Sequence, residues 1–185
     1  GRRTLGHREA RMIRLLVAAE DALGFRLAKD LADRLCLEAE WVDAAHLDAF
    51  REWIAFAGQP YLELKQVRTL ARQHRLQLRG KFDDASGADD ALLMRKLFGV
   101  VVETGIAIDV LVVARDVDGT DRRSGFEQAR RERQQSFAII GALAQPESEA
   151  WLVCAWSPGD PHERAEHTSL RQELGFDPIA RSQEL

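Results

Sequence analysis

The chain has 185 residues, of which 45% are hydrophobic and 30% are charged, and its formal net charge is −4. This length fits one α/β domain with room for an insertion, and the negative charge argues against a protein that coats nucleic acid. No apolar run of about 18 residues is present, so no membrane span is expected. The arginine-rich N-terminus lacks the apolar core of a secretory signal, which predicts a cytoplasmic protein.

Strand-like and helix-like apolar patterns alternate along the chain. In order, the predicted elements are a strand at 12–19, a helix at 25–35, short helices within 41–56 and 61–74, a loop at 80–90, a helix at 91–103, a strand that starts at 108, a helix at 123–133, a strand at 136–143, and helices at 146–156 and 161–174. Such alternation is typical of a mostly parallel sheet with helices on both faces, here of about four strands.

We therefore expect a single domain over residues 1–185. It carries a helical insertion around 36–90 and a C-terminal helical extension around 148–185.

The strand that starts at 108 ends in the sequence Asp116-Val117-Asp118-Gly119-Thr120-Asp121. Alternate residues of an extended segment point the same way, so Asp116 and Asp118 are predicted to present two carboxylates together. Gly119 then turns the chain out of the sheet. Because Mg²⁺ takes one or two carboxylates, keeps waters and bridges to phosphate, the pair is a candidate Mg²⁺ site.

Further acidic residues follow the other predicted strands. Glu20 ends the first strand, and Glu149 lies shortly after the last one. Ligands of parallel α/β sheets bind at the carboxyl ends of the strands, so these residues are expected near the Asp motif. Arg122 and Arg123 come directly after that motif and are candidate contacts for phosphate groups.

Each of these residues also has a purely structural interpretation. Asp118 with Gly119 forms a turn, Glu20 caps the helix that follows it, and Glu149 stabilises the positive end of a helix. Arg122 and Arg123 belong to the solvated face of a charged helix. The sequence leaves these alternatives open.

A strand ending in Glu, followed later by a strand ending in Asp-x-Asp, resembles the TOPRIM domain of topoisomerases, bacterial primases and OLD-type nucleases. The two motifs here are Leu16-Val17-Ala18-Ala19-Glu20 and Val113-Ala114-Arg115-Asp116-Val117-Asp118-Gly119. A third stretch, Glu147-Ser148-Glu149-Ala150-Trp151-Leu152, is similar to the Glu-Ala-Trp helix of small TOPRIM-like proteins in bacterial defence loci. The usual first motif has Gly directly after the Glu, whereas Asp21 stands here.

The resemblance implies a TOPRIM-like fold and a nuclease that depends on Mg²⁺ or Mn²⁺ and cleaves DNA or RNA. Glu20, Asp116 and Asp118 would be its catalytic residues and metal ligands, with Glu149 as a further ligand. Arg122 and Arg123 would bind the phosphates of the nucleic acid.

The resemblance also implies an anti-phage defence complex, oligomeric and away from membranes, in which an ABC- or OLD-type ATPase is a partner. That ATPase would be a separate subunit, because the chain has no Gly-x-x-x-x-Gly-Lys-Ser/Thr loop. Two alternatives stay open. One is a non-catalytic TOPRIM-like partner or regulatory subunit of an ATPase complex, and the other is a small-molecule phosphohydrolase.

Overall fold

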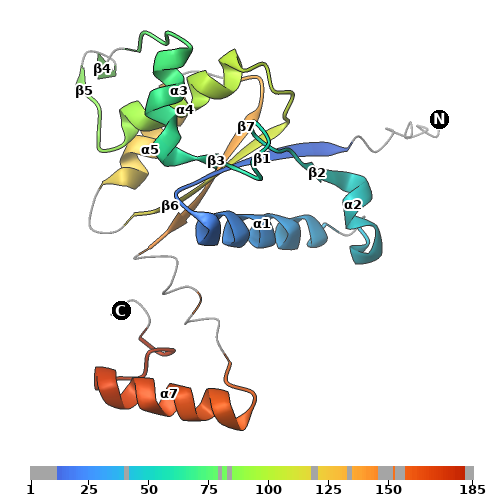
Figure 1. Cartoon of the computed structure of the whole chain (residues 1–185), viewed down its shortest axis with the longest axis vertical. Helices are drawn as coiled ribbons and strands as arrows, with labels where there is room; N and C mark the ends of the chain where they lie inside the picture. The colour runs from blue at the N-terminus through green and yellow to red at the C-terminus, as the bar shows by residue number, and fades with distance from the viewer. Residues whose placement is uncertain are drawn as a thin grey trace, which may run out of the picture.

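The computed structural model of the chain describes residues 12–39, 42–78, 81–82, 85–117, 121–132, 135–145, 152 and 157–181. In this part of the chain a central sheet carries helices on both faces (Figure 1). The predicted α/β class with a mostly parallel sheet is therefore confirmed. No helix of these residues is long and apolar enough to cross a membrane.

The central sheet has the strand order β2-β1-β6-β7, and β3 also pairs with β1. Every one of these pairs is parallel. The strands are β1 (Ile13–Ala19), β2 (Arg51–Trp53), β3 (Leu62–Glu63), β6 (Val110–Asp116) and β7 (Ala138–Ala144). Since β1 and β6 are covered on both faces, their sequences are nearly continuous apolar runs rather than alternating ones.

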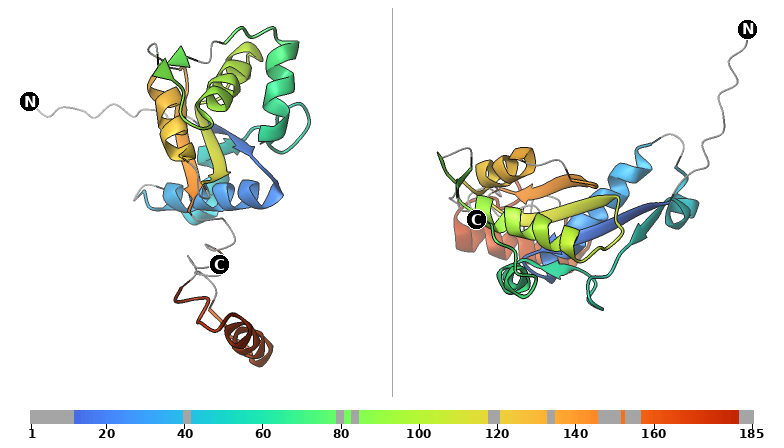
Figure 2. Two further views of the ribbon diagram at one scale, coloured as in Figure 1. Left: turned by 90° about the vertical axis from the view of Figure 1, so that its left-hand side faces the viewer. Right: turned by 90° about the horizontal axis from the view of Figure 1, so that it is seen from above.

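Helices cover the two faces of the sheet unequally (Figure 2). Among the described helices, only α1 packs against one face, and α3, α4 and α5 pack against the other. The described α-helices are α1 (Ala22–Leu37), α2 (Leu47–Phe50), α3 (Val67–Gln73), α4 (Ala91–Glu103), α5 (Arg122–Glu132) and α7 (Pro161–Leu174). None of the residues of α7 is buried, and Figure 1 shows it apart from the sheet.

The region 36–90, expected to be a helical insertion, also supplies sheet strands. It contributes β2, β3 and a small antiparallel hairpin of β4 (Lys81–Phe82) and β5 (Ala85–Ser86), besides the short 3-10 helices η1 (Ala44–His46) and η2 (Leu64–Gln66). The helix expected over 61–74 is wrong at its start, since β3 and η2 precede α3. Strands of two or three residues are too short to show an apolar period, so the sequence did not reveal them.

The helices predicted over 91–103 and 161–174 are confirmed by α4 and α7. The helix predicted over 146–156 lies outside the described residues except for Leu152.

Side chains of β1 and β6 alternate between two cores. Leu16, Ala18, Leu111 and Val113 face α3, α4 and α5, and the core there also includes Phe98. The smaller core against α1 contains their strand neighbours Leu15, Val17, Ala19, Val112 and Ala114. The same alternation determines on which face of the sheet the side chain of each polar residue at a strand end lies.

Candidate functional site

Strand register brings Glu20 and Arg115 together at the carboxyl end of the sheet. In the parallel pair of β1 and β6, Ala19 stands opposite Ala114, so the next residue of each strand emerges beside the other. Arg115 Nη1 donates to Glu20 Oε1 at 2.5 Å. Both side chains follow the alternation of Ala18 and Val113, which places them on the face covered by α4.

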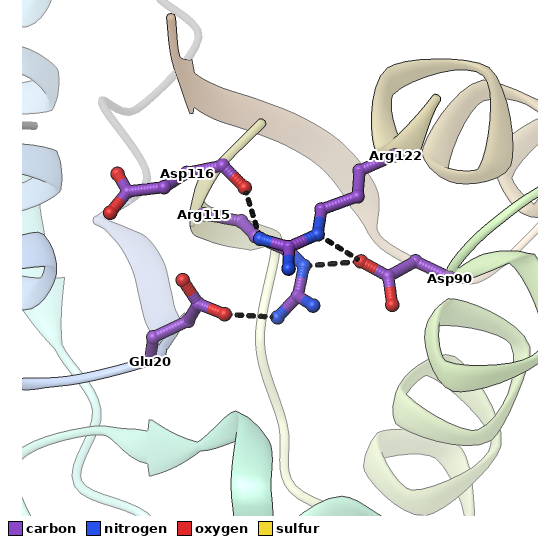
Figure 3. A network of polar contacts seen from close by, with 5 residues as sticks. All are labelled: Glu20, Asp90, Arg115, Asp116 and Arg122. Carbon is purple, nitrogen blue, oxygen red and sulfur yellow. Dashed lines mark hydrogen bonds and ion pairs between the residues drawn. The ribbon is translucent and has the colours of Figure 1, made fainter. Parts of the chain in front are cut away.

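Two more charged residues complete this arrangement (Figure 3). Arg115 Nε donates to Asp90 Oδ2, and Arg122 Nε lies 3.5 Å from the same oxygen. Arg122 Nη1 also donates to the backbone carbonyl of Asp116 at 2.9 Å. We call Glu20, Asp90, Arg115 and Arg122 the strand-end network, because it ties the ends of β1 and β6 to the starts of α4 and α5.

The strand-end network lies mostly out of water. The side chains of Arg115 and Asp90 are only 11% and 16% exposed, and that of Glu20 is 35% exposed. Ion pairs with so little exposure are costly to break, because removing one member leaves the other charge buried without a partner. The arrangement therefore holds two guanidinium groups in fixed positions beside the sheet.

The sequence did not single out Asp90, Arg115, Lys65 or Arg68 as site residues, and Asp90 was the hardest of them to find. The stretch 80–90 was interpreted as a loop, and Asp90 does precede α4, yet its side chain makes no capping hydrogen bond. Its backbone has a φ of +64°, a region that Asp enters more readily than most residues. In this conformation the Asp90 carboxylate faces Arg115 and Arg122. Arg115 is 25 residues away in the chain, so the sequence around Asp90 gave no indication of this contact.

Asp116 lies at the same carboxyl end of the sheet, but its side chain is on the opposite face, the one covered by α1. It follows Val112 and Ala114 in the alternation, and with Gly24, Leu27 and Ala28 of α1 it lines a small cavity. Figure 3 shows its carboxylate directed away from Arg115 and Arg122. The strand ends thus carry Glu20 on the α4 side and Asp116 on the α1 side.

Asp21, not Glu20, caps the first helix. The side chain of Asp21 accepts a hydrogen bond from the backbone N–H of Gly24 at 2.8 Å, and its extended backbone is typical of an N-cap. The residue that stands where the TOPRIM motif has Gly is therefore engaged in starting α1. This leaves the Glu20 carboxylate available to the strand-end network.

Beside this network lies a cleft of about 430 Å³, which we call the α3 cleft. Its lining residues come from the strand ends, from α4, and from the segment that starts α3; they are Glu20, Leu64, Lys65, Arg68, Asp90, Leu93 and Arg115. The carboxyl ends of β1 and β6 open into it, which is the usual position of a ligand in a parallel α/β sheet.

The other predicted site residues are placed as follows. Arg122 belongs to the strand-end network, whereas Arg123 is exposed on α5. Asp118 and Glu149 lie outside the described residues. Within the part of the chain that is described, no three His, Cys, Asp or Glu side chains are grouped so that they could hold a metal ion.

The one described cysteine is not an activated nucleophile. Burial raises the pKa of the Cys36 thiol, the negative charge of Asp33 raises it further, and Arg51 lowers it by less. The neutral thiol is therefore favoured at neutral pH, and a cysteine-based mechanism has no support at this position.

Comparison of the chain with protein-family models, with curated proteins and with solved structures finds no match.

Proposed function

We propose that this chain is a nuclease with a TOPRIM-like fold that hydrolyses phosphodiester bonds with the help of Mg²⁺ or Mn²⁺. The observation that carries the proposal is the placement of Glu20 and Asp116 at the carboxyl ends of two neighbouring central strands, with the fixed guanidinium of Arg115 beside Glu20. Carboxylates that hold a cation and arginines that contact phosphate are the two components that phosphodiester chemistry requires.

The chemistry of the donors suits a hard divalent cation. Glu20 and Asp116 are partly exposed carboxylates on opposite faces of the sheet, so either of them would hold the ion as a single carboxylate ligand, with water filling the other positions. Asp118 is the third predicted ligand and Glu149 the fourth. When bound, the cation would supply charge neutralisation at the phosphodiester and an activated water.

The chain's own residues would orient this chemistry. The ion pair with Arg115 fixes the Glu20 carboxylate, so that it can orient the attacking water or accept its proton. Arg122 fixes the end of β6 through the carbonyl of Asp116, and so positions the backbone that carries the Asp motif. In this proposal the arginines of the strand-end network are positioning residues.

The TOPRIM resemblance supports the wider context of the proposal. The chain would work in the cytoplasm as the effector of an anti-phage defence complex, together with a separate ABC- or OLD-type ATPase. Co-expression of the two proteins followed by size-exclusion chromatography tests this part, with a stable joint peak as the expected result.

A second candidate function is a non-catalytic subunit that keeps the fold and binds the ATPase. The observation that favours it is the Glu20–Arg115 ion pair, since an arginine already neutralises the carboxylate that a metal ion would otherwise contact. The experiment that follows separates the two functions.

Plasmid cleavage with Mg²⁺ or Mn²⁺, with and without the ATPase, tests the nuclease proposal. We expect Asp116→Asn to lose at least about a hundredfold of the rate, as removal of a group at the reacting centre does. Asp30→Asn is the matched control, because Asp30 is an exposed acid on α1, and it should cleave like wild type. No metal-dependent cleavage in any of these conditions would favour the non-catalytic subunit.

A further inference from the structure

We propose that the α3 cleft is a phosphate-binding site, and that its ligand is the backbone of a nucleic-acid strand. The inference rests on the proposed function in one respect, namely that the bound strand is the substrate. It differs from the sequence-based expectation, because Arg123 does not line this cleft, whereas Arg115, Lys65 and Arg68 do.

Arg115 presents a prepared hydrogen-bond donor to the cleft. Two of its nitrogens are engaged, Nε by Asp90 and Nη1 by Glu20, whereas Nη2 has no partner among the described residues. The side chain is only 11% exposed, and the residue lines the cleft, so the remaining nitrogen is a candidate donor to a ligand bound there. A guanidinium held on two sides loses little freedom when its third nitrogen binds an oxygen of phosphate.

The facing wall of the cleft supplies further positive charge. Lys65 is 73% exposed, with its Nζ 3.1 Å from Glu63 Oε2. Arg68 is also exposed, and none of the described acids forms an ion pair with it. Glu20 and Asp90 are matched by Arg115 and Arg122, so Arg68 is the cation that remains in excess.

The distribution of these cations favours a strand over a single compact anion. Arg115 is nearly buried at the carboxyl end of β6, whereas Lys65 and Arg68 are exposed at the start of α3. Cations spread in this way can contact successive phosphates of a nucleic-acid strand. The volume of about 430 Å³ is in the range of ligand pockets. Leu93, which is partly exposed, gives the cleft an apolar side on which a sugar or base can rest, and Leu64 beneath it is buried.

Binding of a fluorescent oligothymidylate in EDTA tests this inference without any contribution from a metal. We expect Arg68→Ala and Lys65→Ala to weaken binding roughly tenfold each at low salt, and to reduce the slope of log K against log salt by about one. The matched control is Arg26→Ala, an exposed arginine on the α1 side of the sheet, which should change neither quantity. Unchanged affinity and slope in Arg68→Ala and Lys65→Ala would overturn the inference.

Two further arms sharpen the assignment. Arg115→Lys keeps the charge and removes the three-nitrogen fork, so it should weaken binding while circular dichroism shows the wild-type fold; full affinity in the folded variant would exclude Arg115 as a ligand. Thymidine monophosphate serves as competitor, and we expect it to compete poorly. Competition as strong as that of the oligonucleotide would show that a free nucleotide, not a strand, is the ligand.

The outcome is separable from that of the proposed function. Strand binding that depends on Arg68, without cleavage under any metal condition, would support the α3 cleft and contradict the nuclease. Metal-dependent cleavage without any role of Arg68 or Lys65 in binding would support the nuclease and contradict the α3 cleft as the binding site.

Discussion

The two faces of the central sheet are built differently. The face under α3, α4 and α5 has the larger core, which includes fully buried residues such as Leu97, Phe98 and Val101. The other described face has α1 alone, and β7 leaves Ile140 48% exposed there. The strand-end network and the α3 cleft belong to the well-covered face, whereas Asp116 and the ion pair of Arg51 with Asp33 lie on the α1 side.

Both faces hold charged groups in fixed positions, since the side chain of Arg51 on the α1 side is 11% exposed, as is that of Arg115. Arginine and carboxylate side chains are expensive to bury unless rigid surroundings hold their partners in place. The starts of α4 and α5 supply those surroundings for the strand-end network, and α1 and α2 supply Asp33 and Asp48 to Arg51. A trough of about 870 Å³ is bordered by α1, β6 and β7 and also by residues of α5 such as Arg123 and Arg130. Leu31, Leu35 and Ile140 line it with partly exposed side chains.

The largest expected effect compares the two faces directly. Phe98→Ala, in the core under α4, should lower the free energy of unfolding by about 3–5 kcal/mol, because it removes buried contacts and leaves a cavity. Ile140→Ala on the α1 side should cost less than about 1 kcal/mol, since much of that side chain already meets water. Urea denaturation measures both, and equal losses would contradict the proposed difference between the faces.

Gly125 tests how closely α5 must approach the start of α4. A Cβ added there would lie 1.7 Å from the backbone carbonyl oxygen of Asp89, so Gly125→Ala forces the backbone next to Asp90 to move. We expect a loss of about 2–3 kcal/mol by urea denaturation. Gly159→Ala is the control, because its Cβ would meet no atom closer than 3.7 Å. A tolerated Gly125→Ala would mean that this contact does not position Asp90.

Asp90→Asn tests the strand-end network itself. The amide keeps the shape and tolerates the left-handed backbone, but it removes the charge that faces Arg115 and Arg122. The expected cost is about 1.5–3 kcal/mol, the range for hydrogen bonds to charged groups. Asp89→Asn, at the exposed neighbouring position, should change stability by less than about 0.5 kcal/mol. If the two variants lose stability equally, the network does not stabilise the fold.

The smallest expected effect concerns pH and the region after α7. The hydrogen bond from His167, together with the N–H groups of Ile179 and Ala180, holds the pKa of Asp177 below its ordinary value of 3.8. A carboxyl with a depressed pKa stabilises the folded state above pH 3.8, and this contribution is lost as the pH falls through the folded pKa. A carboxyl NMR titration should show the depressed value in wild type and a shift back toward 3.8 in His167→Ala.

Sequence patterns were sufficient where an element is long and regular. The strand predicted at 12–19 corresponds to β1, and the helix predicted at 91–103 has the bounds of α4. The short strands β2 and β3 were missed, because two or three residues show no period. Long, periodic elements are thus the ones that the chain's local chemistry determines.

The candidate site was only partly accessible from sequence. Glu20 and Asp116 stand at strand ends because apolar runs stop there, and both runs are visible in the sequence. The Arg115 contact with Glu20 depends on the register of β1 and β6, and the Asp90 contact depends on how α4 meets the sheet. Those relations join residues far apart in the chain, and no local pattern reports them.

The central claim is that Glu20 is a reactive carboxylate and not only the partner of Arg115. The most direct test measures metal-dependent plasmid cleavage and urea denaturation on the same Glu20→Gln protein, with Glu52→Gln on β2 as the exposed control. The proposed function predicts that cleavage falls at least about a hundredfold while stability falls by no more than about 2 kcal/mol. Cleavage at the wild-type rate in Glu20→Gln would contradict the claim and leave Glu20 a purely structural residue.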